Sequence, residues 1–209
     1  MKIYSFGDSH ADYSFRNVIN DENQRVALGP VTMHRVRRDK LDFLDSYKTH
    51  RDVDFDKDSF VVFCFGEIDI RCHIKKQIEI QGKKENEVIN NLISEYVNYI
   101  SRQKKIFKKI GILSITPPAS VVWASQNNDY PFMGTDYDRA RYTIKANGIL
   151  KKMCAENDIS FIDVHRKYSD EKGMLIRELS DGGVHIGNTV YVENEIKKIY
   201  NGINIISSI

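Results

Sequence analysis

Two short segments at opposite ends of the chain hold the residues whose types and spacing could do chemistry. Ser9 follows a short apolar segment, and Asp181 and His185 lie four residues apart near the other end. A serine hydroxyl is a weak nucleophile until a base takes its proton, and an acid must orient that base. Together the segments could supply all three groups, which predicts serine-ester chemistry. Locally, Asp8 or Ser9 would equally suit the N-cap of a helix, so that structural alternative stays open.

Length and composition narrow the class of protein. The 209 residues fit one domain, expected to span residues 1–209. A net charge of +2 gives no strong attraction to nucleic acid, so no nucleic-acid partner is expected. Cys64, Cys72 and Cys154 are scattered without a CxxC spacing, which favours reduced thiols over disulfides or a zinc site. We therefore expect no metal and no cofactor.

The first residues of the chain bear on the cellular compartment of the protein. It has no charged leader followed by a long apolar run, and it opens directly into the segment that carries Ser9. This pattern predicts a cytoplasmic protein. The longest apolar run, residues 60–65, is too short to span a bilayer, so we expect no membrane association.

The elements that must position these residues alternate along the chain. Segments typical of buried parallel strands have continuous apolar runs: 2–6, 24–28, 59–65, 109–115 and 159–164. Predicted helices are 33–47, 85–105, 136–157 and 189–200. The alternation predicts an α/β fold with an open parallel sheet, whose functional groups gather at the carboxyl ends of the strands. The long stretch 116–135, which contains Trp123, is predicted to be a lid or recognition loop, with a surface excursion as the alternative.

Motifs at these strand ends are spaced as in a known family. They are Gly7-Asp8-Ser9 after the first strand, Gly29 after the second, Gly66-x-x-Asp69 after the third, and Asp181 and His185 near the end. Over nearly its whole length the chain resembles the SGNH/GDSL hydrolase superfamily. The resemblance implies a flavodoxin-like three-layer α/β/α sandwich with a five-stranded parallel sheet.

The resemblance also implies roles for individual residues. Ser9 matches the nucleophile, His185 the base and Asp181 the acid. Gly29 matches the glycine whose N–H helps to form the oxyanion hole, together with the N–H beside Ser9.

The chain departs from the family pattern in two places. Ile68 stands where the family has an asparagine that donates to the oxyanion. Loss of such a donor costs roughly 2.7–4 kcal/mol of transition-state stabilisation. Either Arg71 replaces that donor, or catalysis is weaker or different. Asp181 lies four positions before His185 instead of the usual three, with two glycines between them.

Charged residues cluster where the third predicted strand ends, and we expect them at the rim of the site. The predicted substrate-binding residues are Asp8, His10, Glu67, Asp69, Arg71 and His73. Arg71 could grip an anionic substrate group or the oxyanion, since its planar fork suits such acceptors. A local salt-bridge cluster is the alternative. The Gly-Glu-Ile-Asp-x-Arg pattern at residues 66–71 also resembles SGNH-like proteins associated with polysaccharide biosynthesis.

Three functions follow from these patterns. The leading hypothesis is an esterase that hydrolyses a short, acetyl-like acyl ester, carried by a small molecule or a glycan, through an acyl-enzyme on Ser9. The second is a sugar O-acyltransferase of polysaccharide biosynthesis that uses the same nucleophile. The third is a catalytically inactive SGNH domain that binds a glycan, which Ile68 favours. The sequence leaves the oligomeric state open.

Overall fold

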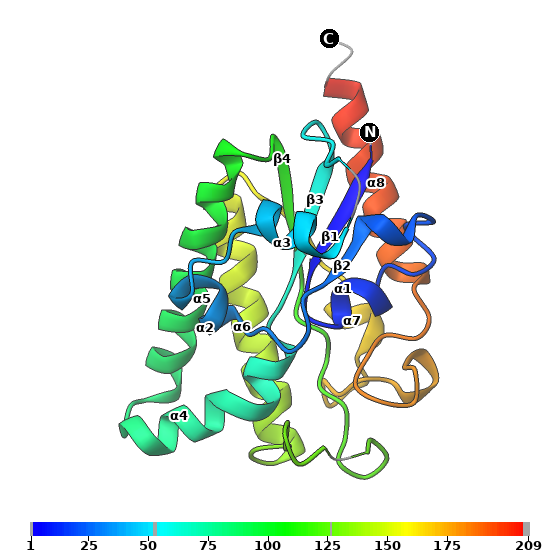
Figure 1. Cartoon of the computed structure of the whole chain (residues 1–209). Helices are drawn as coiled ribbons and strands as arrows, with labels where there is room; N and C mark the ends of the chain where they lie inside the picture. Colours follow the sequence, from blue (N-terminus) through cyan, green and yellow to red (C-terminus); the bar gives the residue numbers. More distant parts are fainter. Residues whose placement is uncertain (1, 52–53, 126, 207–209) are drawn as a thin grey trace.

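A five-stranded parallel sheet organises the molecule (Figure 1). The computed structural model describes residues 2–51, 54–125 and 127–206, with side chains described as far as residue 199. The strands are β1 (Ile3–Gly7), β2 (Arg25–Ala27), β3 (Phe60–Cys64), β4 (Lys109–Leu113) and β5 (Ser160–Ile162). Their order is β2-β1-β3-β4-β5, and all neighbours are parallel. The predicted fold class is confirmed.

The pairing of the central strands explains why a glycine ends β1. The register of β1 with β3 sets Gly7 opposite Cys64. A Cβ atom on Gly7 would lie 1.9 Å from the Cys64 carbonyl oxygen, so only glycine permits this approach. The next amide, that of Asp8, donates to the same carbonyl at 3.2 Å. This close contact turns the chain out of the sheet directly before Ser9.

One face of the sheet carries the larger apolar core. Its helices are α2 (Met33–Arg38), α3 (Phe43–His50), α4 (Ile74–Gln81), α5 (Glu85–Ser101) and α6 (Asp136–Glu156). Phe6 and Phe63 of the strands pack there with buried helix residues such as Ile89 and Tyr96. The stripe predicted on residues 85–105 faces this core because its apolar positions recur at helical spacing.

The opposite face is covered by α1 (His10–Tyr13), α7 (His165–Tyr168) and α8 (Val190–Ile206) (Figure 1). Val62 and Cys64 point to this side because side chains alternate along a strand. Both faces are therefore buried, which accounts for the uninterrupted apolar runs of the strands. No helix in the described ranges is long and apolar enough to cross a membrane.

Some local predictions differ from the structure. The helix predicted over 33–47 is two helices, because Lys40 has a positive φ of 48° and Asp42 caps the start of α3 by accepting from the Asp45 amide. The helix expected after Ser9 is α1, whereas the short helix α7 and the longer α4 were not predicted. A π-helical turn, Asp69–His73, leads into α4. The stretch 116–135 is a loop in its described part, and residue 126 lies outside the described residues.

Candidate active site

Ser9 lies at the carboxyl edge of the sheet, between β1 and α1. It occupies the N-cap position of α1, but its side chain makes no capping hydrogen bond. Its Oγ is instead 2.8 Å from Nε2 of His185, which is 176 residues away in the sequence. The hydroxyl thus contacts a ring nitrogen that could take its proton.

Asp181 lies on the far side of the His185 ring. Its Oδ2 is 2.8 Å from Nδ1 of His185, and its Oδ1 accepts the amides of Gly183 and His185 at 2.8 and 3.2 Å. Gly182 has a φ of 87°, so the chain between the acid and the histidine folds into a tight turn that returns His185 to Asp181. The extra residue in this spacing is absorbed by the turn, and Ser9, His185 and Asp181 form a connected row.

Electrostatics suit these two side chains to act as acid and base. Burial favours the protonated form of Asp181, but hydrogen bonds from His185 and the Gly183 amide lower its pKa below the ordinary value. Burial lowers the pKa of His185, and the nearby His10 lowers it further against the opposing effect of Asp181. At neutral pH His185 is therefore a neutral base, with Nδ1 protonated toward Asp181 and Nε2 free to accept from Ser9.

Tyr13 is a site residue that the sequence analysis missed. Its ring stacks on the His185 ring with centroids 3.9 Å apart and an interplanar angle of 8°. The guanidinium of Arg16 covers the Tyr13 ring at 3.9 Å from its centroid. The signal that could have found Tyr13 is its spacing, because residues four apart share a helix face and Tyr13 follows Ser9 by four.

Two backbone amides are available as oxyanion donors. Neither the Ser9 nor the Gly29 N–H donates a hydrogen bond within the described residues. They follow the adjacent strands β1 and β2, whose ends are joined by the Leu28 amide donating to the Gly7 carbonyl at 2.8 Å. Ile68 is 5% exposed and brings no donor. The two amides have no competing acceptor, so their role in an oxyanion hole stays a prediction, and the third position is apolar.

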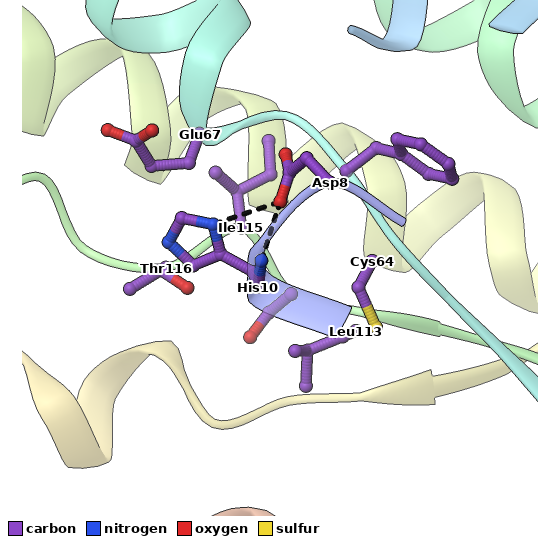
Figure 2. Close-up of a pocket in the computed structure, with 9 residues that line it drawn as sticks. Asp8, His10, Cys64, Glu67, Leu113, Ile115 and Thr116 are labelled. Carbon is purple, nitrogen blue, oxygen red and sulfur yellow. Dashed lines mark hydrogen bonds and ion pairs between the residues drawn. The ribbon is translucent and has the colours of Figure 1, made fainter. Parts of the chain in front are cut away.

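Asp8 and His10, whose ring lies 4.8 Å from the His185 ring, line a cavity of about 10 Å³ together with Glu67 (Figure 2). Asp8 Oδ1 accepts the His10 amide at 2.9 Å and faces His10 Nδ1 at 3.0 Å. His10 Nε2 is 3.2 Å from the carbonyl oxygen of Val184. Asp8 is 0% and His10 is 4% exposed, which supports a role in holding the site over direct contact with substrate.

Glu67 and Arg71 form a buried ion pair. Nε and Nη2 of Arg71 donate to the two carboxylate oxygens of Glu67 at 2.7 and 3.0 Å, and the side chains are 9% and 4% exposed. The remaining nitrogen, Nη1, donates to the Tyr130 carbonyl at 2.5 Å. Every guanidinium nitrogen of Arg71 is thereby engaged. This geometry supports the salt-bridge alternative over an oxyanion or substrate contact.

The ion pair also anchors the loop before α6. The Arg71 carbonyl accepts the Met133 amide at 2.8 Å, and Phe132 lies between Arg71 and Arg139, with ring centroid distances of 5.6 and 4.9 Å. Arg139 is fully buried and donates to the Gly134 carbonyl at 2.8 Å. The loop is thus held at the carboxyl edge of the sheet, beside the segment that follows β3 (Figure 1).

Asp69 and His73 do not reach the row of Ser9, His185 and Asp181. Asp69 is 2% exposed, and its Oδ2 accepts the Met33 amide at 2.8 Å at the start of α2. Burial raises the pKa of Asp69 to about 7. His73 lies at the start of α4, where loss of part of its hydration, together with the nearby Lys76 and Arg71, lowers its pKa. Through its hydrogen bond with the Met33 amide, Asp69 connects the segment that follows β3 to the segment that follows Gly29.

Comparisons with known proteins place this geometry in context. No family model and no curated protein sequence matches the chain. Among solved structures, a GDSL-like lipase from Bacteroides thetaiotaomicron is 15% identical with a TM-score of 0.58, over 97% of this chain and 88% of that one. Axe2, an acetylxylan esterase from Geobacillus stearothermophilus, is 12% identical with a TM-score of 0.53, over 94% and 92%.

A domain whose name does not describe an enzyme has a similar structure. The OSK domain of Drosophila Oskar is 12% identical with a TM-score of 0.56, over 93% of this chain and 86% of that domain. Such identities establish the fold and leave function to the site residues. The chain therefore shares its fold with a GDSL-like lipase and an acetylxylan esterase, the fold that its sequence motifs indicated.

Proposed function

We propose that the protein is a serine esterase that hydrolyses short, acetyl-like acyl esters through an acyl-enzyme on Ser9. The observation that carries this proposal is the continuous hydrogen-bonded row, with Ser9 Oγ 2.8 Å from His185 Nε2 and His185 Nδ1 2.8 Å from Asp181 Oδ2. A residue that only capped α1 would not need to contact a histidine from the other end of the chain. The arrangement meets the geometric requirement for an activated serine.

The reaction follows from the positions of the protons. His185 takes the Ser9 proton on Nε2 while Ser9 Oγ attacks the ester carbonyl carbon, and the carbonyl oxygen becomes an oxyanion beside the Ser9 and Gly29 amides. His185 then gives the proton to the departing alkoxide, which leaves as an alcohol. A water molecule, deprotonated by the same nitrogen, attacks the acyl-enzyme and releases the acid and Ser9.

The surroundings of His185 favour the charge that it acquires in each step. Asp181 accepts from Nδ1 at 2.8 Å and stabilises the imidazolium. The stacked Tyr13 ring presents its electron-rich face to the same cation. Both contacts strengthen when the ring becomes positive, so they lower the barrier more than they stabilise the resting enzyme.

We propose an acylated carbohydrate as the natural substrate class. Acetylxylan esterases are among the proteins that share this fold, and residues 66–71 resemble a pattern associated with polysaccharide biosynthesis. The loop tied to Arg71 carries the partly exposed aromatic residues Trp123, Tyr130 and Phe132 near the strand ends. Trp123 and Tyr130 combine an apolar ring with a polar N–H or O–H, which suits recognition at a partly wet surface.

The central experiment asks whether Ser9 is activated. The protein is treated with a fluorophosphonate and the labelled peptide is mapped by mass spectrometry, alongside turnover of p-nitrophenyl acetate. We expect label on Ser9, and loss of both label and turnover in Ser9→Ala. Labelling elsewhere, or none, would overturn the proposal.

A second measurement separates the acyl acceptors. Products from p-nitrophenyl acetate are analysed with and without added mono- and oligosaccharides. p-Nitrophenol is released in either case; free acetate as the sole acyl product supports hydrolysis, whereas an acetylated sugar would assign the same nucleophile to an acyltransferase. Release of acetate from an acetylated oligosaccharide would support the carbohydrate assignment.

A further inference from the structure

A second Asp–His pair lies directly beside the candidate triad, and the reaction as described above does not use it. The pair is Asp8 and His10, and the ring centroids of His10 and His185 are 4.8 Å apart. Both members are buried, with side chains 1% and 5% exposed. A buried pair this close to the base will influence it through both packing and charge.

The hydrogen-bond partners of His10 indicate where its protons are. Nδ1 faces Oδ1 of Asp8, which already accepts the His10 backbone amide. Nε2 faces the Val184 carbonyl oxygen at 3.2 Å, and a carbonyl oxygen can only accept. Both ring nitrogens therefore need a proton to be satisfied, and a histidine with two protons is an imidazolium.

We infer that His10 is a positioning residue that acts as a fixed imidazolium: it holds the Val184 carbonyl, and so the backbone that carries His185, and its charge keeps His185 neutral and able to accept the Ser9 proton. This inference rests on the proposed function of Ser9 and His185. His10 itself touches neither the substrate nor the reacting atoms.

Charged and titratable groups on every neighbouring element bear on this pair. His10 is faced by Asp8 from its own turn, Glu67 from the segment after β3, and Cys64 from β3. Arg71 lies against Glu67 and offsets its charge. Burial alone would lower the pKa of His10, but Asp8, with smaller effects from Glu67, raises it above the ordinary value.

The base has its own set of neighbours. His185 is faced by Asp181, by the Tyr13 ring and by Glu67, besides His10. Asp181 and Glu67 raise the pKa of His185, whereas burial and His10 lower it. Removal of the His10 charge should therefore move the His185 ionisation to higher pH.

Two neutral variants separate the charge from the hydrogen bond. In His10→Gln the side-chain amide nitrogen can take the place of Nε2 and still donate to Val184, whereas His10→Asn reaches only the place of Nδ1. Both variants should raise the His185 midpoint, and the acid limb of kcat/KM, by about one pH unit. Only His10→Asn should also lower kcat on p-nitrophenyl acetate by a further factor of about ten, because Val184 is no longer held.

Histidine NMR on the full chain tests the inference directly. In the wild type, the ring nitrogen signals of His10 should show two protons at pH 7, and the His185 titration should be compared with that of both variants. The matched control is His165→Asn, a buried histidine at the start of α7, which should leave the His185 midpoint unchanged.

Several outcomes would overturn the inference. These are a singly protonated His10 at pH 7 in the wild type, a His185 midpoint that stays in place in both variants, or equal kcat losses in His10→Gln and His10→Asn. The wild-type spectrum decides the first point even if a variant does not fold. Failure of the esterase proposal is a separate result, since absent labelling of Ser9 leaves the two titrations measurable.

Discussion

The two Asp–His pairs at the strand ends are built from the same side chains but differ in what the second ring nitrogen faces. The carboxylate-to-Nδ1 distances are 2.8 Å for Asp181–His185 and 3.0 Å for Asp8–His10. In the first pair Nε2 meets the Ser9 hydroxyl, which can donate, and in the second it meets a carbonyl oxygen, which cannot. The same residue type is thus a proton acceptor in one place and a fixed cation in the other.

Burial separates the pairs as well. The side chains of His185 and Asp181 are 17% and 23% exposed, against 5% and 1% for His10 and Asp8. A base must meet substrate and exchange protons, so it needs access to solvent. A buried ion pair contributes little to stability as a whole, but removal of one partner is costly because it leaves the other charge without compensation. Substitutions in the first pair should therefore act chiefly on activity. Substitutions in the second should cost more stability and change activity less, through the pH profile and the position of His185.

The largest effect is expected at the base and the nucleophile. Ser9→Ala or His185→Ala should lower kcat on p-nitrophenyl acetate by roughly 10⁴-fold or more, because each removes a group without which the row has no function. The thermal midpoint should stay within a few degrees of wild type, measured by circular dichroism. Gross unfolding of either variant would contradict the assignment and favour a structural role for these side chains.

The acid of the first pair should matter less. Asp181→Ala should lower kcat by roughly 10³-fold, since loss of the acid leaves nucleophile and base in place. Because Asp181 raises the pKa of His185, the acid limb of kcat/KM should also move to lower pH in this variant. A loss as large as that of Ser9→Ala would show that Asp181 does more than orient the ring.

The acid of the second pair should show the opposite balance. Asp8→Asn leaves the buried His10 charge without its partner and should cost about 3–5 kcal/mol of unfolding free energy in urea titrations. The matched variant Asp181→Asn, in the more exposed pair, should cost about 1 kcal/mol. Addition of His10→Gln to Asp8→Asn should recover much of the loss. Equal costs in Asp8→Asn and Asp181→Asn would remove the distinction between the pairs.

Arg71 extends the comparison to a second buried ion pair, the one that it forms with Glu67. Arg71→Met should cost about 3 kcal/mol of unfolding free energy because Glu67 is left buried and unpaired, and Glu67→Gln in the same chain should restore most of it. On a small neutral ester, kcat of the double variant should stay near the wild-type value. A hundredfold fall in kcat and kcat/KM with KM unchanged would instead place Arg71 in the oxyanion hole.

The smallest effect concerns Asp69, a buried acid that forms no ion pair with any residue that the structure describes. Its pKa rises from 3.8 to about 7 on folding, so the folded state binds the proton more tightly and Asp69 costs stability as pH rises through that window. Asp69→Asn removes this cost while an amide oxygen can still accept from Met33. The gain in thermal midpoint over wild type should be larger at pH 8 than at pH 5. An equal difference at both values would contradict the raised pKa.

Much of the architecture could be read from local sequence. The apolar runs around Val62 and Ile112 are uninterrupted because both sheet faces are covered, and their alternation with helices predicted the confirmed parallel sheet. The segment 33–47 was predicted as one helix, since the positive φ of Lys40 leaves no mark on its apolar spacing. Short helices such as α7 bury few residues and carry too little periodicity to be recognised.

The candidate site also has a part that could be predicted from the sequence and a part that could not. Residue type and motif spacing in the sequence named Ser9, Asp181 and His185, because nucleophile, acid and base must each be a specific side chain. Tertiary structure alone decided what those side chains meet: Tyr13 stacked on His185, and the Val184 carbonyl facing His10. These contacts join residues up to 174 positions apart through a backbone oxygen or a ring face, which every sequence contains and no motif records.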